Sequence, residues 1–256
     1  MDYRKAGFWQ LMILSLLLNF VVQTVHEAGH WVILESSGRG PVWGFNQLLQ
    51  LWDTMPLHPD KWVETVAPDG TKGWLHLTSS PGKIEYIIML SAGPIASVLG
   101  VLFGLSLLRW SRNRAIKQMG LVLALISSLI MSQYYLRGFH RMGGDEYFLA
   151  YALGIRKYII DIPFGLFFVT AFIFAVRSLG EWRIRIKWLG AVCLGSIPAG
   201  LFIMKANSIV LTQVNNDNPL FCPILGWSLP VVIVNILICA ALWLWWKLED
   251  KALTDK

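Results

Sequence analysis

Residues 7–34 read GFWQLMILSLLLNFVVQTVHEAGHWVIL, and this stretch decides the fold. A helix needs about 20 mainly apolar residues to cross a hydrocarbon layer roughly 30 Å thick, and this run is long enough to do so. It is too long for the apolar part of a secretory signal peptide and lacks a convincing cleavage site. We therefore expect it to stay in the mature protein as a signal anchor that spans the membrane.

Five further apolar runs of similar length follow the first one. The 256 residues are 55% hydrophobic and 15% charged, with a mean hydropathy of +0.53, whereas soluble domains carry about 25% charged residues. Because lipid offers no hydrogen-bond partners to the backbone, spanning segments of this kind form helices. The sequence predicts an all-α polytopic membrane protein in a lipid bilayer, with about six transmembrane helices at residues 7–34, 84–109, 117–137, 158–177, 187–205 and 227–247.

Basic residues concentrate at the N-terminus and in the segments between the second and third runs and between the fourth and fifth runs, and the formal net charge is +6. By the positive-inside rule these segments lie in the cytoplasm. We expect cytoplasmic N- and C-termini and place the long connection 35–83, with the segment after the third run, on the outer face. No basic patch interleaved with aromatic residues is present, so no nucleic-acid partner is expected. The basic positions are Arg4, Lys5, Arg109, Arg112, Arg114, Lys117, Arg177, Arg183, Arg185 and Lys187.

The connection 35–83 is rich in tryptophan, which favours the headgroup level of a bilayer. Within it, residues 62–66 (WVETV) and 73–77 (GWLHL) lie on either side of Pro68-Asp69-Gly70, a turn-forming sequence. Such a pattern is typical of two strands joined by a tight turn. We predict a short β-hairpin at the membrane surface.

The first apolar run carries His26-Glu27-Ala28-Gly29-His30, an H-E-x-x-H pattern. Residues four apart share one face of a helix, so both imidazoles can bind one Zn²⁺ ion. Glu27, one position along, can activate the water at the metal as the catalytic base. Ionisable groups inside a membrane helix are costly and indicate function. The alternative is that the helix ends near Val25 and these are interfacial polar residues.

A catalytic zinc usually takes three protein ligands, so a third must come from elsewhere. Asp145 is the strongest candidate, because it lies on the same side of the membrane, after Gly143-Gly144 and before an apolar run at 147–155 that suits a helix. Alternatively, Asp145 only caps that helix. Glu146, His140 and His76 are the reserve candidates.

The residues His26–His30, Ser91-Ala92-Gly93-Pro94-Ile95-Ala96-Ser97 and Gly144-Asp145 together resemble the motifs of the site-2 protease family of intramembrane zinc metalloproteases. The resemblance covers residues 7–155. It implies hydrolysis of a peptide bond in or near the transmembrane segment of a membrane protein substrate. It also implies that Gly93, Pro94 and Ser97 hold that substrate. The family usually has asparagine where Ser97 stands and glycine where Glu146 stands.

The extent of this resemblance divides the chain into two parts. Residues 1–155, with the connection 35–83, are expected to form a three-helix zinc-protease core, and residues 156–256 to add three transmembrane helices. Two other functions remain open, namely a non-proteolytic membrane zinc hydrolase of a lipid-like substrate and a catalytically silent membrane scaffold. Without the resemblance, Gly93-Pro94 is a helix break whose small neighbours permit close helix packing.

Overall fold

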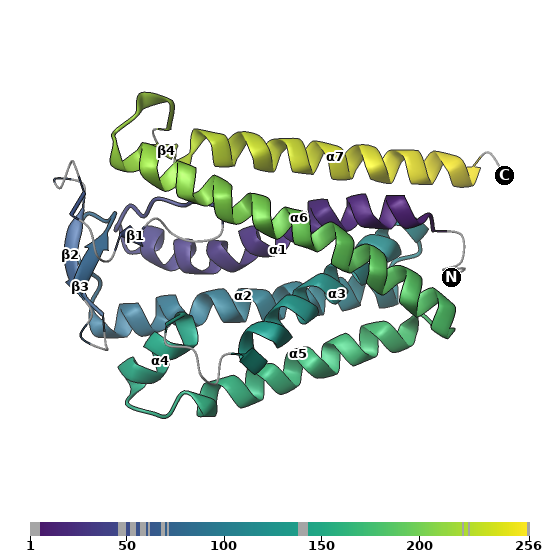
Figure 1. The fold of residues 1–256 in the computed structure, drawn as a ribbon, viewed down its shortest axis with the longest axis horizontal. Coiled ribbons are helices and arrows are strands. Elements are labelled where there is room, and N and C mark those ends of the chain that lie inside the picture. The colour runs from purple at the N-terminus through teal and green to yellow at the C-terminus, as the bar shows by residue number, and fades with distance from the viewer. Residues whose placement is uncertain are drawn as a thin grey trace.

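A computed structural model describes residues 6–45, 50–51, 55–56, 60, 62–67, 70, 72–137, 143–221, 223–224 and 226–254. Helices dominate these residues (Figure 1). The helices are α1 (Phe8–Ser36), α2 (Lys83–Trp110), α3 (Arg114–Arg137), α4 (Asp145–Leu153), α5 (Tyr158–Ser178), α6 (Trp182–Asn215) and α7 (Leu229–Thr254).

Six of these helices are long and apolar enough to cross a membrane, namely α1, α2, α3, α5, α6 and α7. The predicted all-α membrane architecture is therefore confirmed. Both termini lie at one end of the bundle (Figure 1), as an even number of spans requires. Their location in the cytoplasm stays a prediction, because the arrangement of the helices does not distinguish the two sides of a membrane.

Helix α6 is longer than the predicted span, which ended at residue 205. Lys205 and Asn207 lower the local hydropathy there, but the helix continues to Asn215. Its last turns are held by tertiary contacts, since Val210 and Val214 are buried and the Asn207 Oδ1 atom accepts a hydrogen bond from the Phe45 amide at 2.8 Å. Packing, which a hydropathy pattern does not report, extends the helix.

Helix α3 lies at the centre of the bundle, packed against α1, α2 and α5. Residues 121–126 are all buried, unlike most residues on the outer helices. The contact between α2 and α3 depends on two glycines that face each other. A Cβ atom on Gly104 would lie 2.8 Å from the Gly120 carbonyl oxygen, and one on Gly120 would lie 2.6 Å from the Gly104 oxygen. Small residues of this kind let membrane helices approach closely.

Helices from the C-terminal part of the chain pack directly on the N-terminal part. Helix α6 packs along α1 and α5 packs along α3. Helix α7 lies outermost (Figure 1), and the Thr24 hydroxyl of α1 donates a hydrogen bond to the Asn235 Oδ1 atom of α7 at 3.0 Å. The division into a 1–155 core and a 156–256 addition stays a prediction about function.

A small antiparallel sheet lies at the end of the bundle opposite the termini (Figure 1). Strand β2 (Val63–Val66) pairs with β3 (Lys72–Leu75), and β1 (Gln50–Leu51) adds to the other edge of β3. The predicted hairpin is thus confirmed, with one strand more than expected. Leu75 and Leu77 are buried in a cluster with Leu34, Met89 and Leu149. This cluster attaches the sheet to the ends of α1, α2 and α4.

A second attachment joins the chain after α1 to the chain before α7. The Trp43 amide donates a hydrogen bond to the Gly226 carbonyl at 2.6 Å, and the rings of Trp43 and Trp227 lie 4.1 Å apart. Beyond α6 the chain continues through a 3-10 turn (Pro219–Phe221), β4 (Pro223–Ile224) and β5 (Trp227–Ser228). The segment that carries Trp227, far away in the sequence, therefore meets α1 and the chain that follows it around Trp31.

Candidate metal centre

The two histidines of the H-E-x-x-H pattern lie on one face of α1, one turn apart. Helix α1 continues without a break to Ser36, so the alternative in which it ends near Val25 is wrong. His30 is buried, whereas 17% of the His26 side chain is exposed. Their imidazole Nε2 atoms lie 3.4 Å from each other.

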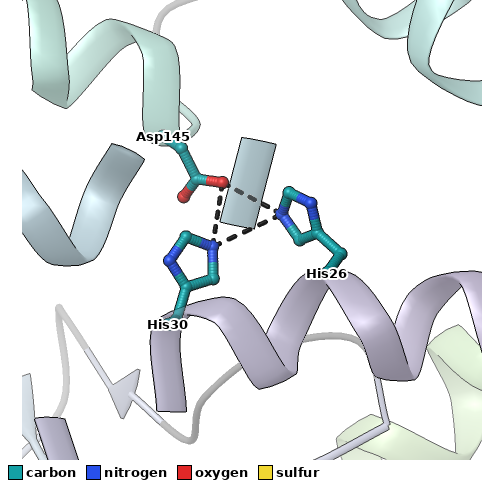
Figure 2. Close-up of side chains that lie close together, drawn as sticks. All are labelled: His26, His30 and Asp145. Carbon is teal, nitrogen blue, oxygen red and sulfur yellow. Dashed lines mark hydrogen bonds and ion pairs between the residues drawn. The ribbon is translucent and has the colours of Figure 1, made fainter. Parts of the chain in front are cut away.

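Asp145 completes the group from the start of α4 (Figure 2). Its Oδ2 atom lies 3.1 Å from His26 Nε2 and 3.1 Å from His30 Nε2. The N-cap of α4 is Gly144, with no side-chain capping bond, so the carboxylate points toward the histidines and is not the N-cap. The structure therefore brings together the three side chains that the sequence analysis selected as metal ligands.

The distances among these three atoms fit a metal ion. Zinc binds nitrogen and oxygen ligands at about 2.0–2.2 Å in a tetrahedral arrangement, which separates two ligand atoms by about 3.3 Å. The observed separations are 3.1, 3.1 and 3.4 Å. Within the described part of the chain, this is also the one group of three or more His, Cys, Asp or Glu side chains whose ligand atoms lie within 4.8 Å of one another.

Hydrogen bonds from α2 orient both imidazoles. A carbonyl oxygen only accepts, so His30 Nδ1–H donates to the Met89 carbonyl at 2.7 Å, which leaves the Nε2 lone pair free for a metal. His26 Nδ1 lies 2.9 Å from the Ser97 hydroxyl oxygen. With its Nε2 atom on a metal, His26 donates its Nδ1–H to this oxygen. Partners of this kind fix the tautomer and the ring orientation of metal-binding histidines.

The Gly93-Pro94 step of α2 makes room for this arrangement. A Cβ atom on Gly93 would overlap the His30 ring, with its Cε1 atom at 2.5 Å and its Cδ2 atom at 2.9 Å. Pro94 has no amide hydrogen and cannot donate to the carbonyl four residues earlier, but α2 continues through it from Lys83 to Trp110, so the expected helix break at Gly93-Pro94 is not present. Gly93 and Ser97 thus both face the histidines, whereas their predicted contact with substrate stays a prediction.

Close approach of the α1 and α2 backbones depends on Gly29, which lies between the two histidines in sequence. A Cβ atom here would lie 2.6 Å from the Ala92 carbonyl carbon and 2.9 Å from the Gly93 nitrogen. Backbone atoms cannot move aside as a flexible side chain can. The glycine of the H-E-x-x-H segment therefore sets the distance at which α2 can reach both imidazoles.

Glu27 and Asp145 give the centre its negative charge. Glu27 is 5% exposed and lies near enough to His30 for a favourable charge interaction. Burial favours the neutral form of Asp145, but the His30 and His26 imidazoles outweigh it and hold the pKa of this carboxyl well below its ordinary value. A bound metal ion would take the place of the protons on the two imidazoles, and an ionised Asp145 with two neutral imidazoles is a ligand set suited to a divalent cation.

Two charged side chains beside the centre, Lys157 and Asp161, have no role in the sequence-based predictions, and Glu146 is there only as a reserve ligand. Lys157 lies 3.1 Å from Glu146 Oε1 and 3.6 Å from Asp161 Oδ2. Burial raises the pKa of Glu146, while Tyr134 and Lys157 act against that rise. The acids at the start of two adjacent apolar runs were the available signal, but nothing in their spacing indicates that one lysine contacts both.

The reserve candidates for the third ligand have other surroundings. Glu146 faces Lys157, and the His76 ring packs against Trp62 with centroids 5.0 Å apart. His140 lies outside the described residues. Asp145 is thus the described acidic or histidine side chain that completes the pair on α1.

Any assignment of function rests on the geometry of the candidate metal centre, because comparisons with known proteins found no match. No family model matches the chain, and no curated protein or solved structure matches it either.

Proposed function

We propose that the chain is an intramembrane zinc metalloprotease that hydrolyses a peptide bond in or near a transmembrane segment of a membrane protein. The observation that carries the proposal is the convergence of His26 Nε2, His30 Nε2 and Asp145 Oδ2 within a bundle of apolar helices, with Glu27 on the same helix. This is the ligand number of a catalytic zinc site, which keeps a fourth position for water or substrate.

In this proposal each residue has a separate task. A bound zinc ion would act as a Lewis acid and lower the pKa of a coordinated water. Glu27 takes the proton from the attacking water and passes it to the leaving amine. Met89 and Ser97 orient the imidazoles, and Gly93 leaves space for the His30 ring.

The small sheet formed by β1, β3 and β2 is an argument that the substrate is a peptide. A transmembrane helix must unwind before its carbonyl groups can be attacked, and an extended segment can then pair with the edge of a sheet. Within the described residues β2 pairs on one side only, with β3, and Val66 on this edge is exposed. Since Leu75 and Leu77 attach the sheet to α1, α2 and α4, this edge lies at the end of the bundle that carries the metal centre.

The first test is the zinc content of detergent-purified protein, measured by elemental analysis on wild type and Asp145→Ala. We expect about one zinc ion in the wild type, as one catalytic site requires, and loss or marked weakening in the variant. Wild-type protein without zinc would contradict the proposal.

Hydrolysis is tested with a library of quenched-fluorescence apolar peptides in micelles and, separately, with extracted membrane lipids. Glu27→Gln should retain zinc and lose activity by about 100- to 10,000-fold, because general acid–base catalysis contributes this much. Glu35→Gln, an exposed position near the end of α1, is the matched control. Lipid products without peptide products would favour the lipid hydrolase, and zinc without either product would favour the silent scaffold.

A further inference from the structure

A buried charged cluster connects the metal centre to the next transmembrane helix. The Lys157 ammonium lies 3.1 Å from Glu146 Oε1 of α4 and 3.6 Å from Asp161 Oδ2 of α5. The exposed fractions of the three side chains are 15%, 1% and 0%, respectively. One cation is therefore shared by two carboxylates that have almost no contact with solvent.

The position of the cluster along the chain matters more than its charge. Glu146 follows Asp145 directly in the first turn of α4, and Asp161 lies in the first turn of α5. Lys157 is the N-cap residue of α5. The lysine thus links the beginnings of two helices, and one of those beginnings carries the third metal ligand.

Helix α4 needs such an anchor, because it is short and its entry is unusual. It has nine residues and begins after Gly143 and Gly144, whose φ angles are 103° and 93°. A Cβ atom on Gly144 would overlap the Tyr134 hydroxyl and lie 3.0 Å from Glu146 Oε2, so the side chains around this entry leave no room for one. Metal ligands must be placed to within about 0.2 Å, and a small rotation of this turn would move Asp145 further than that.

We propose that Lys157 is a positioning residue of the metal centre, which holds Asp145 in place by tying Glu146 on α4 to Asp161 on α5. The inference rests on the proposed zinc site and deepens it. It also gives a task to Glu146, the residue that stands where the resembled family usually has glycine.

Positioning and simple electrostatics predict opposite effects when Lys157 loses its charge. Removing a cation near a bound metal ion lowers repulsion, so charge alone predicts tighter metal binding. Removing the anchor leaves two buried carboxylates without their cation, and the first turn of α4 then moves. Positioning therefore predicts weaker binding, by about 10- to 100-fold, as for other partners of metal ligands.

The experiment measures the affinity for zinc and the visible spectrum of the cobalt(II) form, using the full chain in detergent. The variants are Lys157→Met and Lys157→Arg, and the control is Arg156→Met, an exposed basic residue one position earlier. We expect weaker zinc binding and a changed cobalt spectrum for Lys157→Met, retention of most affinity for Lys157→Arg, and wild-type behaviour for Arg156→Met.

Equal or tighter zinc binding by Lys157→Met, with an unchanged cobalt spectrum, would overturn the positioning role while leaving the zinc site intact. Wild-type protein that binds neither metal would overturn the proposed function itself. If Lys157→Met does not fold, Lys157→Gln takes its place, because its polar amide suits the site but is one atom shorter than the lysine side chain and has no charge with which to hold both carboxylates. Weaker binding by that variant supports the proposal, and unchanged binding refutes it.

Discussion

At the scale of single residues, the centre depends as much on orientation as on ligands. His26 and His30 each have one nitrogen toward the candidate metal position and the other toward a hydrogen-bond partner on α2. The two partners differ in kind, since Met89 uses its backbone carbonyl and Ser97 its side chain. Only the Ser97 hydroxyl can be removed by substitution without disturbing the helix.

Ser97→Ala should weaken zinc binding by about 10- to 100-fold, because the His26 ring loses the oxygen that fixes its tautomer. The affinity is measured by competition with a chromophoric chelator. Ser91→Ala is the matched control on the same helix, since the Ser91 hydroxyl donates to the Ile87 carbonyl of its own turn. Equal affinities for the two variants would show that Ser97 does not orient the ligand.

Gly93→Ala should abolish zinc binding, because the added methyl group would occupy the position of the His30 ring. The zinc content of the purified variant gives the answer. Gly100→Ala on the same helix places its Cβ atom 3.7 Å from Val25 Cγ1, an ordinary contact. The control should therefore bind zinc like the wild type, and a Gly93→Ala protein with full zinc content would contradict the geometry described above.

At the scale of helices, glycines set the distances between neighbours in the bundle. Gly29 brings α2 to α1, Gly104 and Gly120 bring α2 to α3, and Gly195 brings α6 to α1. Without a hydrophobic driving force between helices in lipid, close packing of this kind supplies much of the stability. The contact at Gly195 offers a test of packing alone.

Gly195→Ala should destabilise the protein by about 1–3 kcal/mol, the usual cost of overpacking. Its Cβ atom would overlap the Met12 carbonyl and lie 2.8 Å from Ser15 Cβ. Thermal unfolding in detergent measures the change. Gly200→Ala, on the same helix with nothing within 4 Å of the new atom, should be neutral or slightly stabilising, by up to about 1 kcal/mol. A neutral Gly195→Ala variant would mean that α6 packs more loosely on α1.

At the scale of the whole molecule, the metal centre joins elements that are distant in sequence. Helix α1 carries two of the candidate ligands, α4 carries the third, α2 supplies the hydrogen-bond partners of the histidines, and Lys157 at the start of α5 contacts α4. A ligand that binds only the folded state stabilises that state by mass action. Zinc should therefore raise the stability of the whole bundle.

Adding zinc at about 100 times its dissociation constant should increase the free energy of unfolding by about 2.7 kcal/mol, and a chelator should reverse the gain. Thermal unfolding with and without the chelator measures this difference. Asp145→Ala should show little response to zinc at the same concentration. If neither zinc nor the chelator changes the unfolding temperature of the wild type, zinc does not bind the folded protein.

Much of the fold and part of the centre followed from the sequence alone. Six spans, the hairpin at residues 62–77 and the pair His26 and His30 depend on local regularities, such as apolar length, a turn sequence between two strand-like segments and the helical repeat of about 3.6 residues. These regularities act over a few residues, so a linear pattern contains them. The position of Asp145 beside the two histidines also agrees with the prediction, because two glycines and an apolar run marked the start of a helix, whereas its role as a metal ligand stays a prediction.

Only the tertiary structure decided which groups surround those ligands. Asp145 meets His26 across 119 positions of the chain, and Ser97 meets it across 71. The contacts of Met89, Ser97 and Lys157 with His30, His26 and Glu146 form between different helices, and the last turns of α6 form because of packing rather than hydropathy. Such contacts depend on how rigid helices fit against each other in three dimensions, which no spacing along the chain specifies.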